Sequence, residues 1–234
     1  MTAGRAHSGP PGDGSIDLAN LAALRGAVYR VFADLFLSPQ RLAQLVAATP
    51  EVRTASEPLR SLAFFSSFER ILGRLDTIDD DAFASIEREY AHLFVAGDHA
   101  HAAPPLETAY LHRGGFDAGF VLARIEDAYA REGLVPLRGQ APDHVSTEME
   151  FMAALCHREA GESPGEAPGV EAAQRSFLRE HPARWLPRFA ERLAMIWPEG
   201  DYAAFATAAV AFVAHDVRFL DALLGVEAEA RHGR

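Results

Sequence analysis

The chain of 234 residues is long enough for one substantial hydrophobic core and short for two, so we expect a single domain. Its 49% hydrophobic and 24% charged residues are typical of a soluble globular protein and argue against a disordered or fibrous chain. The formal net charge of -11, without an arginine- or lysine-rich run, argues against nucleic acid as a partner and favours basic partners such as an arginine-bearing peptide.

Residues 1–16 are rich in Gly, Pro and Ser and lack the apolar core of a secretion signal, which indicates a disordered lead-in. A single cysteine, Cys156, cannot form an intrachain disulfide, a thiolate zinc cage or an iron–sulfur site, and it fits a reducing compartment. We therefore expect a cytoplasmic protein without membrane insertion.

Amphipathic spacing predicts helices over most of residues 17–225. The first helix begins at Asp17, repeats apolar residues every three or four positions, and stops at Ser38-Pro39. The same spacing predicts further helices over 58–75, 81–96, 117–133 and 143–160, several of which begin at an aspartate that can cap the first turn. Residues 161–169, GESPGEAPG, are predicted to form a flexible loop.

After this loop, the segments VEAAQRSFLREH and WLPRFAERLAMIW predict two more helices. The last helix begins with an apolar run of about a dozen residues before His215, short of the roughly 20 that span a bilayer. We expect this helix at the centre of the bundle and a C-terminal tail over residues 226–234. No strand pattern competes and no repeat is visible, so the predicted fold is an all-α, single-domain globular helical bundle.

One candidate site is a metal centre. Glu89 and His92 match half of a di-iron Glu-x-x-His motif, but the second half is missing, so a solvated helix face is the favoured interpretation of both side chains. His99 and His101 lack a third ligand. A di-iron-like metal- or small-molecule-binding bundle remains the alternative function. Catalysis has less support, because neither a nucleophile elbow nor a phosphate-binding glycine loop is present.

A second candidate site is a peptide groove. Tyr90, Leu93 and Phe94 end one predicted helix, and Pro104 and Pro105 stiffen the loop that follows. Such an arrangement can hold an apolar helical peptide, although spacing alone favours the interpretation that Tyr90, Leu93 and Phe94 join the core.

The segment that begins at Pro142 has two interpretations. Asp143 is a natural N-cap, which would place His144 in the first helical turn and Glu148 one turn further on. A histidine above a glutamate near a groove can contact an arginine-bearing ligand or form a surface pair, and composition does not decide between them.

These segments together resemble the TorD/DmsD/NarJ family of redox-enzyme maturation chaperones. The matching stretches are YRVFADLFLSP (29–39), EYAHLF (89–94), APPLETAY (103–110), PDHVSTEMEFM (142–152) and FLREHPARWLPRFAERL (177–193). The chain departs from the family pattern at Thr108, where relatives often have serine, and at Pro142, which directly precedes Asp143.

The resemblance implies an all-helical cytoplasmic chaperone without catalytic activity. Family members bind the twin-arginine signal peptide and the apo-form of a molybdenum enzyme of the dimethyl-sulfoxide-reductase superfamily. They delay export until the molybdopterin guanine dinucleotide is inserted. The resemblance further implies no tightly bound cofactor, at most transient contact with that dinucleotide or GTP, and a monomer or homodimer.

Site residues follow from the same resemblance. Peptide-binding positions are Tyr90, Leu93, Phe94, Pro104 and Pro105 on one wall of a groove and Asp143 and His144 on the other, with Glu107, Tyr110 and Glu148 as supporting residues. His181, Trp185 and Pro187 match family patterns too, and we assign them to packing and hydrogen bonding. A twin-arginine signal places two guanidinium groups beside an apolar segment, so its receptor needs carboxylates and an aromatic groove.

Overall fold

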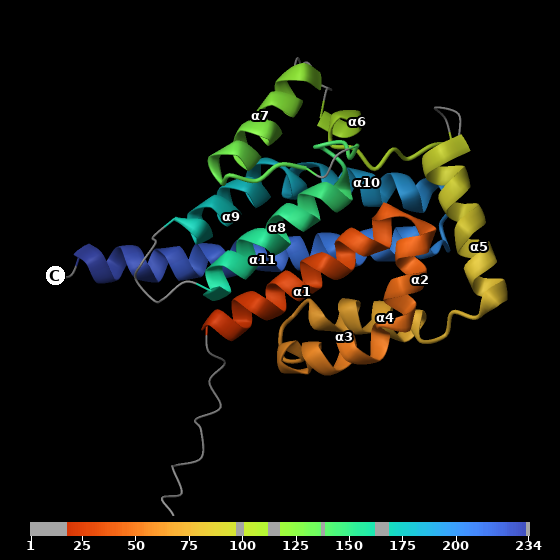
Figure 1. The fold of residues 1–234 in the computed structure, drawn as a ribbon, viewed down its shortest axis with the longest axis horizontal. Coiled ribbons are helices and arrows are strands. Elements are labelled where there is room, and N and C mark those ends of the chain that lie inside the picture. Colours follow the sequence, from red (N-terminus) through yellow and green to blue (C-terminus); the bar gives the residue numbers. More distant parts are fainter. Residues whose placement is uncertain (1–17, 97–100, 112–117, 137–138, 162–168, 233–234) are drawn as a thin grey trace, which may run out of the picture.

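The first helix of the computed structural model, α1 (Leu18–Leu37), ends where the sequence predicts. Ser38 is extended (φ -170°) and its hydroxyl accepts a hydrogen bond from the backbone N–H of Arg41 at 3.3 Å, so it caps the next helix, which begins at Pro39. The structure describes residues 18–96, 101–111, 118–136, 139–161 and 169–232 (Figure 1). The predicted lead-in and most of the predicted loop 161–169 lie outside these residues.

Helices account for almost all of the regular structure in the described residues. They are α2 (Pro39–Ala47), α3 (Thr49–Ser56), the 3₁₀ turn η1 (Glu57–Leu59), α4 (Phe65–Leu75), α5 (Asp80–Tyr90), the π-helical η2 (Ala91–Ala96), α6 (Thr108–Leu111), α7 (Ala118–Arg131), α8 (Val145–Gly161), α9 (Val170–Glu180), α10 (Pro182–Ile196) and α11 (Asp201–His232). The one β-type pairing found among them is an isolated antiparallel bridge between Leu106 and His144. The all-α prediction is therefore confirmed.

The core lies between α1, α8, α10 and α11. The most extensive packing joins α1 to α8, and α10 packs along α11 (Figure 1). Gly26 allows the close approach of α1, because a Cβ atom there would lie 3.1 Å from the Cβ atom of Cys156 on α8. Fully buried aromatic side chains fill the space between these helices: Tyr29, Phe32, Phe36, Trp185, Phe189, Tyr202, Phe205 and Phe212.

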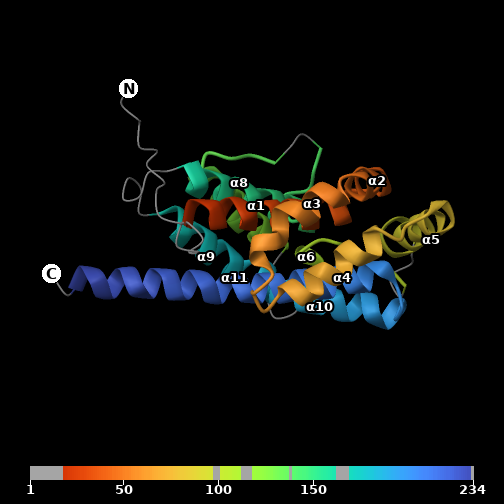
Figure 2. The same ribbon diagram turned by 90° about the horizontal axis from the view of Figure 1, so that it is seen from below.

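Three local predictions differ from the structure. The segment 58–75 is not one helix, since turns follow η1 and α4 begins only at Phe65. The short helices α2, α3 and α6 had no counterpart in the prediction. The predicted tail also differs, because α11 continues through residues 226–232 and extends beyond the other helices at its C-terminal end (Figure 2).

Helix α11 deserves comparison with a membrane span. By length and composition, Asp201–Gly225 could cross a bilayer, with a mean hydropathy of 1.4. The prediction considered only the apolar run before His215 and therefore underestimated the length of the apolar segment. Half of its most apolar window is buried inside the protein, and the helix packs against α4, α9 and α10. These contacts are those of a core helix.

Candidate functional site

Backbone hydrogen bonds bring together three of the segments that carried the family resemblance. The N–H of Ala103 donates to the carbonyl of Leu93, and the N–H of Val145 donates to the carbonyl of Pro105, both at 2.9 Å. The N–H of Glu107 donates to the carbonyl of Asp143, also at 2.9 Å. Residues 89–94, 103–110 and 142–148, here called the motif junction, therefore form one unit.

The predicted peptide-binding residues differ in exposure. Leu93 is fully buried, and Pro105 is buried too. Tyr90 and Phe94 are half-buried and pack edge to face with ring centroids 5.1 Å apart, while the Tyr90 hydroxyl donates to the carbonyl of Leu37 at 3.1 Å. Pro104 is exposed. The surface that this wall offers to a ligand therefore comes from Tyr90, Phe94 and Pro104.

Neither Asp143 nor His144 has the local role that the sequence suggested. Asp143 is buried, and its Oδ2 accepts hydrogen bonds from the backbone N–H (3.2 Å) and the hydroxyl (2.6 Å) of Thr108, so it caps α6 rather than α8. His144 precedes α8, and its Nδ1 accepts from the N–H of Ser146 at 3.1 Å. Burial lowers the pKa of His144 to about 4, against a smaller opposing effect of Asp143, so the ring is neutral near pH 7.

The supporting residues form a buried polar cluster beside this junction. Glu107 lies 2.9 Å from Nδ1 of His181, and Glu148 accepts a hydrogen bond from the indole N–H of Trp185 at 3.0 Å. Burial raises the pKa of Glu148, and the neighbouring Glu107 carboxyl raises it further. Glu148 therefore keeps its proton at pH values where a glutamate in water is already ionised. Tyr110 stacks on Trp185 with centroids 5.6 Å apart.

Glu89 does not lie on a solvated helix face, and that interpretation was wrong. Its side chain is buried, and its two carboxylate oxygens accept hydrogen bonds from the backbone N–H groups of Asp201 and Tyr202, each at 3.0 Å. A glutamate distant in sequence thereby provides hydrogen-bond acceptors for two N–H groups at the start of α11 and places its carboxylate at the positive end of the helix dipole. His92 is exposed and lies against Trp197, with ring centroids 5.5 Å apart.

The half-motif for a di-iron site is thus engaged in other contacts. Both Glu89 oxygens serve α11, and no group of three or more His, Cys, Asp or Glu side chains suited to a metal ion occurs in the parts of the chain that the structure describes. His99 lies outside the described residues, and the ring of His101 lies 6.4 Å from that of His92.

A buried ion cluster at the other end of the bundle was missed by the sequence analysis. Arg25 donates to Asp216 through Nε (2.6 Å) and a terminal nitrogen (3.0 Å), and to Glu159 at 2.8 Å. Gln174 and the hydroxyl of Tyr29 complete the cluster. Arg25 and Asp216 both fall on apolar stripes of their helices, and that coincidence could have indicated a buried pair.

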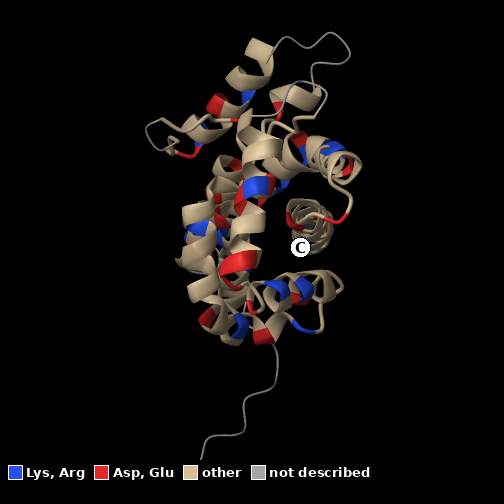
Figure 3. Ribbon diagram, turned by 90° about the vertical axis from the view of Figure 1, so that its right-hand side faces the viewer, with Lys and Arg blue, Asp and Glu red and all other residues tan. Residues whose placement is uncertain are grey.

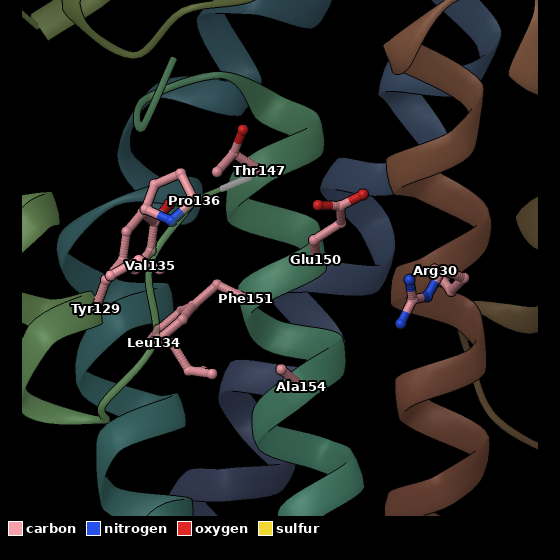
Figure 4. Close-up of a pocket in the computed structure, with 9 residues that line it drawn as sticks. All are labelled: Arg30, Tyr129, Leu134, Val135, Pro136, Thr147, Glu150, Phe151 and Ala154. Carbon is pink, nitrogen blue, oxygen red and sulfur yellow. The ribbon is translucent and has the colours of Figure 1, made fainter. Parts of the chain in front are cut away.

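A cavity of about 250 Å³ opens between α8, α1 and the segment that follows α7 (Figure 4). Its lining residues are Arg30, Tyr129, Leu134, Val135, Pro136, Thr147, Glu150, Phe151 and Ala154. Figure 3 shows basic residues scattered among acidic ones rather than gathered into one surface.

Comparisons with known proteins agree with the resemblance. A family model described as nitrate reductase delta subunit matches residues 46–191. The chain is 28% identical over 212 residues to the chaperone protein TorD of Vibrio cholerae, covering 86% of this chain and 93% of that protein. It is 29% identical over 176 residues to TorD of a Psychrobacter species, covering 72% and 78%. A selenate reductase assembly chaperone of Thauera selenatis is 46% identical over 54 residues, covering 22% and 28%.

Proposed function

The chain belongs to the nitrate reductase delta subunit family, and on that premise we propose that it is a maturation chaperone rather than an enzyme. Its client would be a molybdopterin-dependent oxidoreductase of the dimethyl-sulfoxide-reductase superfamily, bound in its apo-form through a twin-arginine signal peptide. The observation that carries the proposal is the similarity to TorD over 86% of the chain, which includes the whole motif junction in an all-helical fold. The name of the Thauera relative, a reductase assembly chaperone, supports the same class of client.

The motif junction supplies a plausible peptide-binding face for this role. Tyr90, Phe94, Pro104 and His144 keep exposed surface for an apolar peptide, while Leu93, Pro105 and Asp143 fix the backbone beneath them. The neutral ring of His144 adds a polar contact that does not repel a cationic peptide. In this proposal the buried members are required for the shape of the face and the exposed members for contact.

Binding of the signal peptide would delay export until the cofactor is inserted. We propose that this takes place in the cytoplasm, that the chaperone acts as a monomer or homodimer, and that contact with molybdopterin guanine dinucleotide or GTP is transient.

The test is calorimetric titration of the purified protein with a synthetic twin-arginine signal peptide of a molybdenum reductase. Wild type should bind, and Phe94→Ala should weaken binding because the half-buried ring leaves the face. Leu18→Ala is the control, since Leu18 is 56% exposed in the first turn of α1 and belongs to none of the three segments of the junction. Absence of binding by wild type to such peptides, together with stoichiometric iron in the purified protein, would overturn the proposal in favour of a metal-binding bundle.

A further inference from the structure

The cavity on α8 has a regular floor. Thr147, Glu150, Phe151 and Ala154 are separated by three or four positions, so they lie on one face of the helix, and this face spans about 10 Å. Arg30 of α1 forms one side and Tyr129 with residues 134–136 forms the other (Figure 4). We call this surface, defined by the nine lining residues, the α8 groove.

The apolar side of the α8 groove is built without help from a ligand. Gly133 has a φ of +65°, which lets the chain reverse at the end of α7. The N–H of Leu134 donates to the carbonyl of Tyr129 at 2.9 Å, the closing bond of a Schellman turn. Arg158 donates to both the carboxylate and the carbonyl of Glu132, each at 2.8 Å. Leu134 and Val135 are therefore held beside Phe151, and Val135 remains 85% exposed.

Two charged side chains of the α8 groove lack hydrogen bonds. Neither the Glu150 carboxylate nor the Arg30 guanidinium has a hydrogen bond or close ion pair with any residue that the structure describes, although Arg30 acts on Glu150 at longer range. In Figure 4 the Glu150 side chain extends toward the helix that carries Arg30. The nearby Asp34 and Arg41 pair with each other at 2.6 Å. The partly buried Glu150 carboxylate therefore keeps its acceptor positions open to solvent, where a cationic ligand can use them.

Other carboxylates around the motif junction are already engaged. Asp143 serves Thr108 and Glu107 pairs with His181. Glu148 accepts from Trp185 through one oxygen, and its complete burial closes the other oxygen to an outside ligand. Glu89 serves the first turn of α11. Unlike these four, Glu150 could be reached by a guanidinium from outside without breaking an internal bond.

The size and charge of the α8 groove favour a polypeptide segment. A volume of about 250 Å³ falls below the roughly 300–1,000 Å³ of small-molecule and cofactor pockets, so it suits one or two side chains rather than a nucleotide. The net charge of -11 favours a basic ligand at long range. The groove also begins at Thr147, one turn along α8 from His144, so a peptide can contact both surfaces.

We propose that the α8 groove binds a basic, apolar peptide segment, with an apolar side chain against Phe151 and Leu134 and a guanidinium group on Glu150. The inference rests on the proposed function and deepens it, because it places the arginine-binding carboxylate of the chaperone on Glu150 instead of Asp143. The motif junction then contacts the apolar part of the same peptide.

The test titrates full-length protein with two synthetic peptides, a twin-arginine signal peptide and the same peptide with both arginines replaced by glutamine. Glu150→Gln keeps the shape of the side chain and breaks no internal hydrogen bond, so the fold should persist, as checked by circular dichroism. Because Glu150→Gln loses a charge-assisted hydrogen bond, its affinity for the arginine peptide should fall about tenfold or more. Its affinity for the glutamine peptide should equal that of wild type. Glu126→Gln, at an exposed position on α7, is the control for net charge and should change neither affinity.

Two further variants sharpen the result. Val135→Ser removes an exposed apolar contact, so the affinities for both peptides should fall equally, by about threefold to tenfold. Arg30→Gln should leave the affinity for the arginine peptide unchanged or raise it.

If wild type binds the arginine peptide and Glu150→Gln binds it as tightly as Glu126→Gln does, the subsite is wrong while the proposed function stands. If Arg30→Gln causes the larger loss, Glu150 does not carry the main polar contact with the peptide and the proposal falls. If wild type binds neither peptide, both the subsite and signal-peptide recognition are overturned.

Discussion

Gly200 lies so close to Glu89 that a Cβ atom on residue 200 would come within 2.3 Å of the Glu89 Oε1 atom. The carboxylate occupies this space because it accepts the N–H groups of Asp201 and Tyr202 at the start of α11. A glycine is therefore required at this position by a side chain from α5, in addition to any demand of the turn itself.

Gly200→Ala should lower the free energy of unfolding by about 1–2 kcal/mol, because the methyl group displaces Glu89 from its capping position. Urea unfolding followed by circular dichroism measures this. Gly73→Ala is the matched control, since a Cβ atom there meets nothing within 4 Å inside α4 and should stabilise by up to about 1 kcal/mol. Equal effects of the two substitutions would contradict the capping role.

Arg25→Met should destabilise the protein by about 3–5 kcal/mol, since it leaves the buried Asp216 carboxylate without its cation. Arg60→Met removes an arginine of the same size from exposed pairs with Glu57 and Glu69, and should cost at most about 1 kcal/mol. Chemical unfolding of both variants measures the difference. A cost for Arg25→Met no larger than that for Arg60→Met would show that the cluster does not stabilise the fold.

Glu148→Gln should change how stability depends on pH. The native pKa of Glu148 lies above its ordinary value of 4.5 because of burial, so the native state binds a proton that the unfolded state releases. Wild-type stability attributable to this group is therefore greatest below pH 4.5 and declines as pH rises toward the native pKa. Glutamine keeps an acceptor for Trp185 and should abolish that decline in melting temperatures recorded between pH 4.5 and 8. Parallel curves for the two proteins would refute the assignment.

His144→Asn tests a dependence of stability on pH that is opposite in sign to that of Glu148. The native pKa of about 4 lies below the ordinary value of 6.5, so the unfolded state takes up a proton first and wild-type stability falls as pH falls from 6.5 to about 4. Asparagine can still cap α8 but does not titrate in this range. Free energies of unfolding from urea titrations at pH 7, 5.5 and 4.5 should therefore diverge, with wild type losing more stability than the variant. The idea fails if wild type loses no more than the variant.

Most helices could be predicted from the sequence because their apolar spacing is regular. The limits of α1 and α8–α10 agree with the expected segments to within a few residues. The short helices α2 and α3 were missed because they begin at Pro39 and beside Pro50, where proline suggests an interruption even though it is well tolerated in a first turn.

The local chemistry of the site was less predictable, since it depends on partners distant in sequence. Nothing near Glu89 indicates that its acceptors are satisfied by residues 201 and 202. Asp143 had a sufficient local explanation as an N-cap, and only the tertiary position of Thr108 changes it. The family resemblance drew attention to the three segments that the structure joins by backbone hydrogen bonds into the motif junction. That its exposed residues bind a peptide stays a prediction.

The Arg25 cluster also bears on when the chain can fold. Its two principal members are 191 positions apart, on the first and the last helix. A nascent chain that has not yet exposed residue 216 outside the ribosome holds a guanidinium among apolar side chains with its main anion missing, so the interior cannot close around it. The native core is thus completed only after most of the polypeptide has been synthesised.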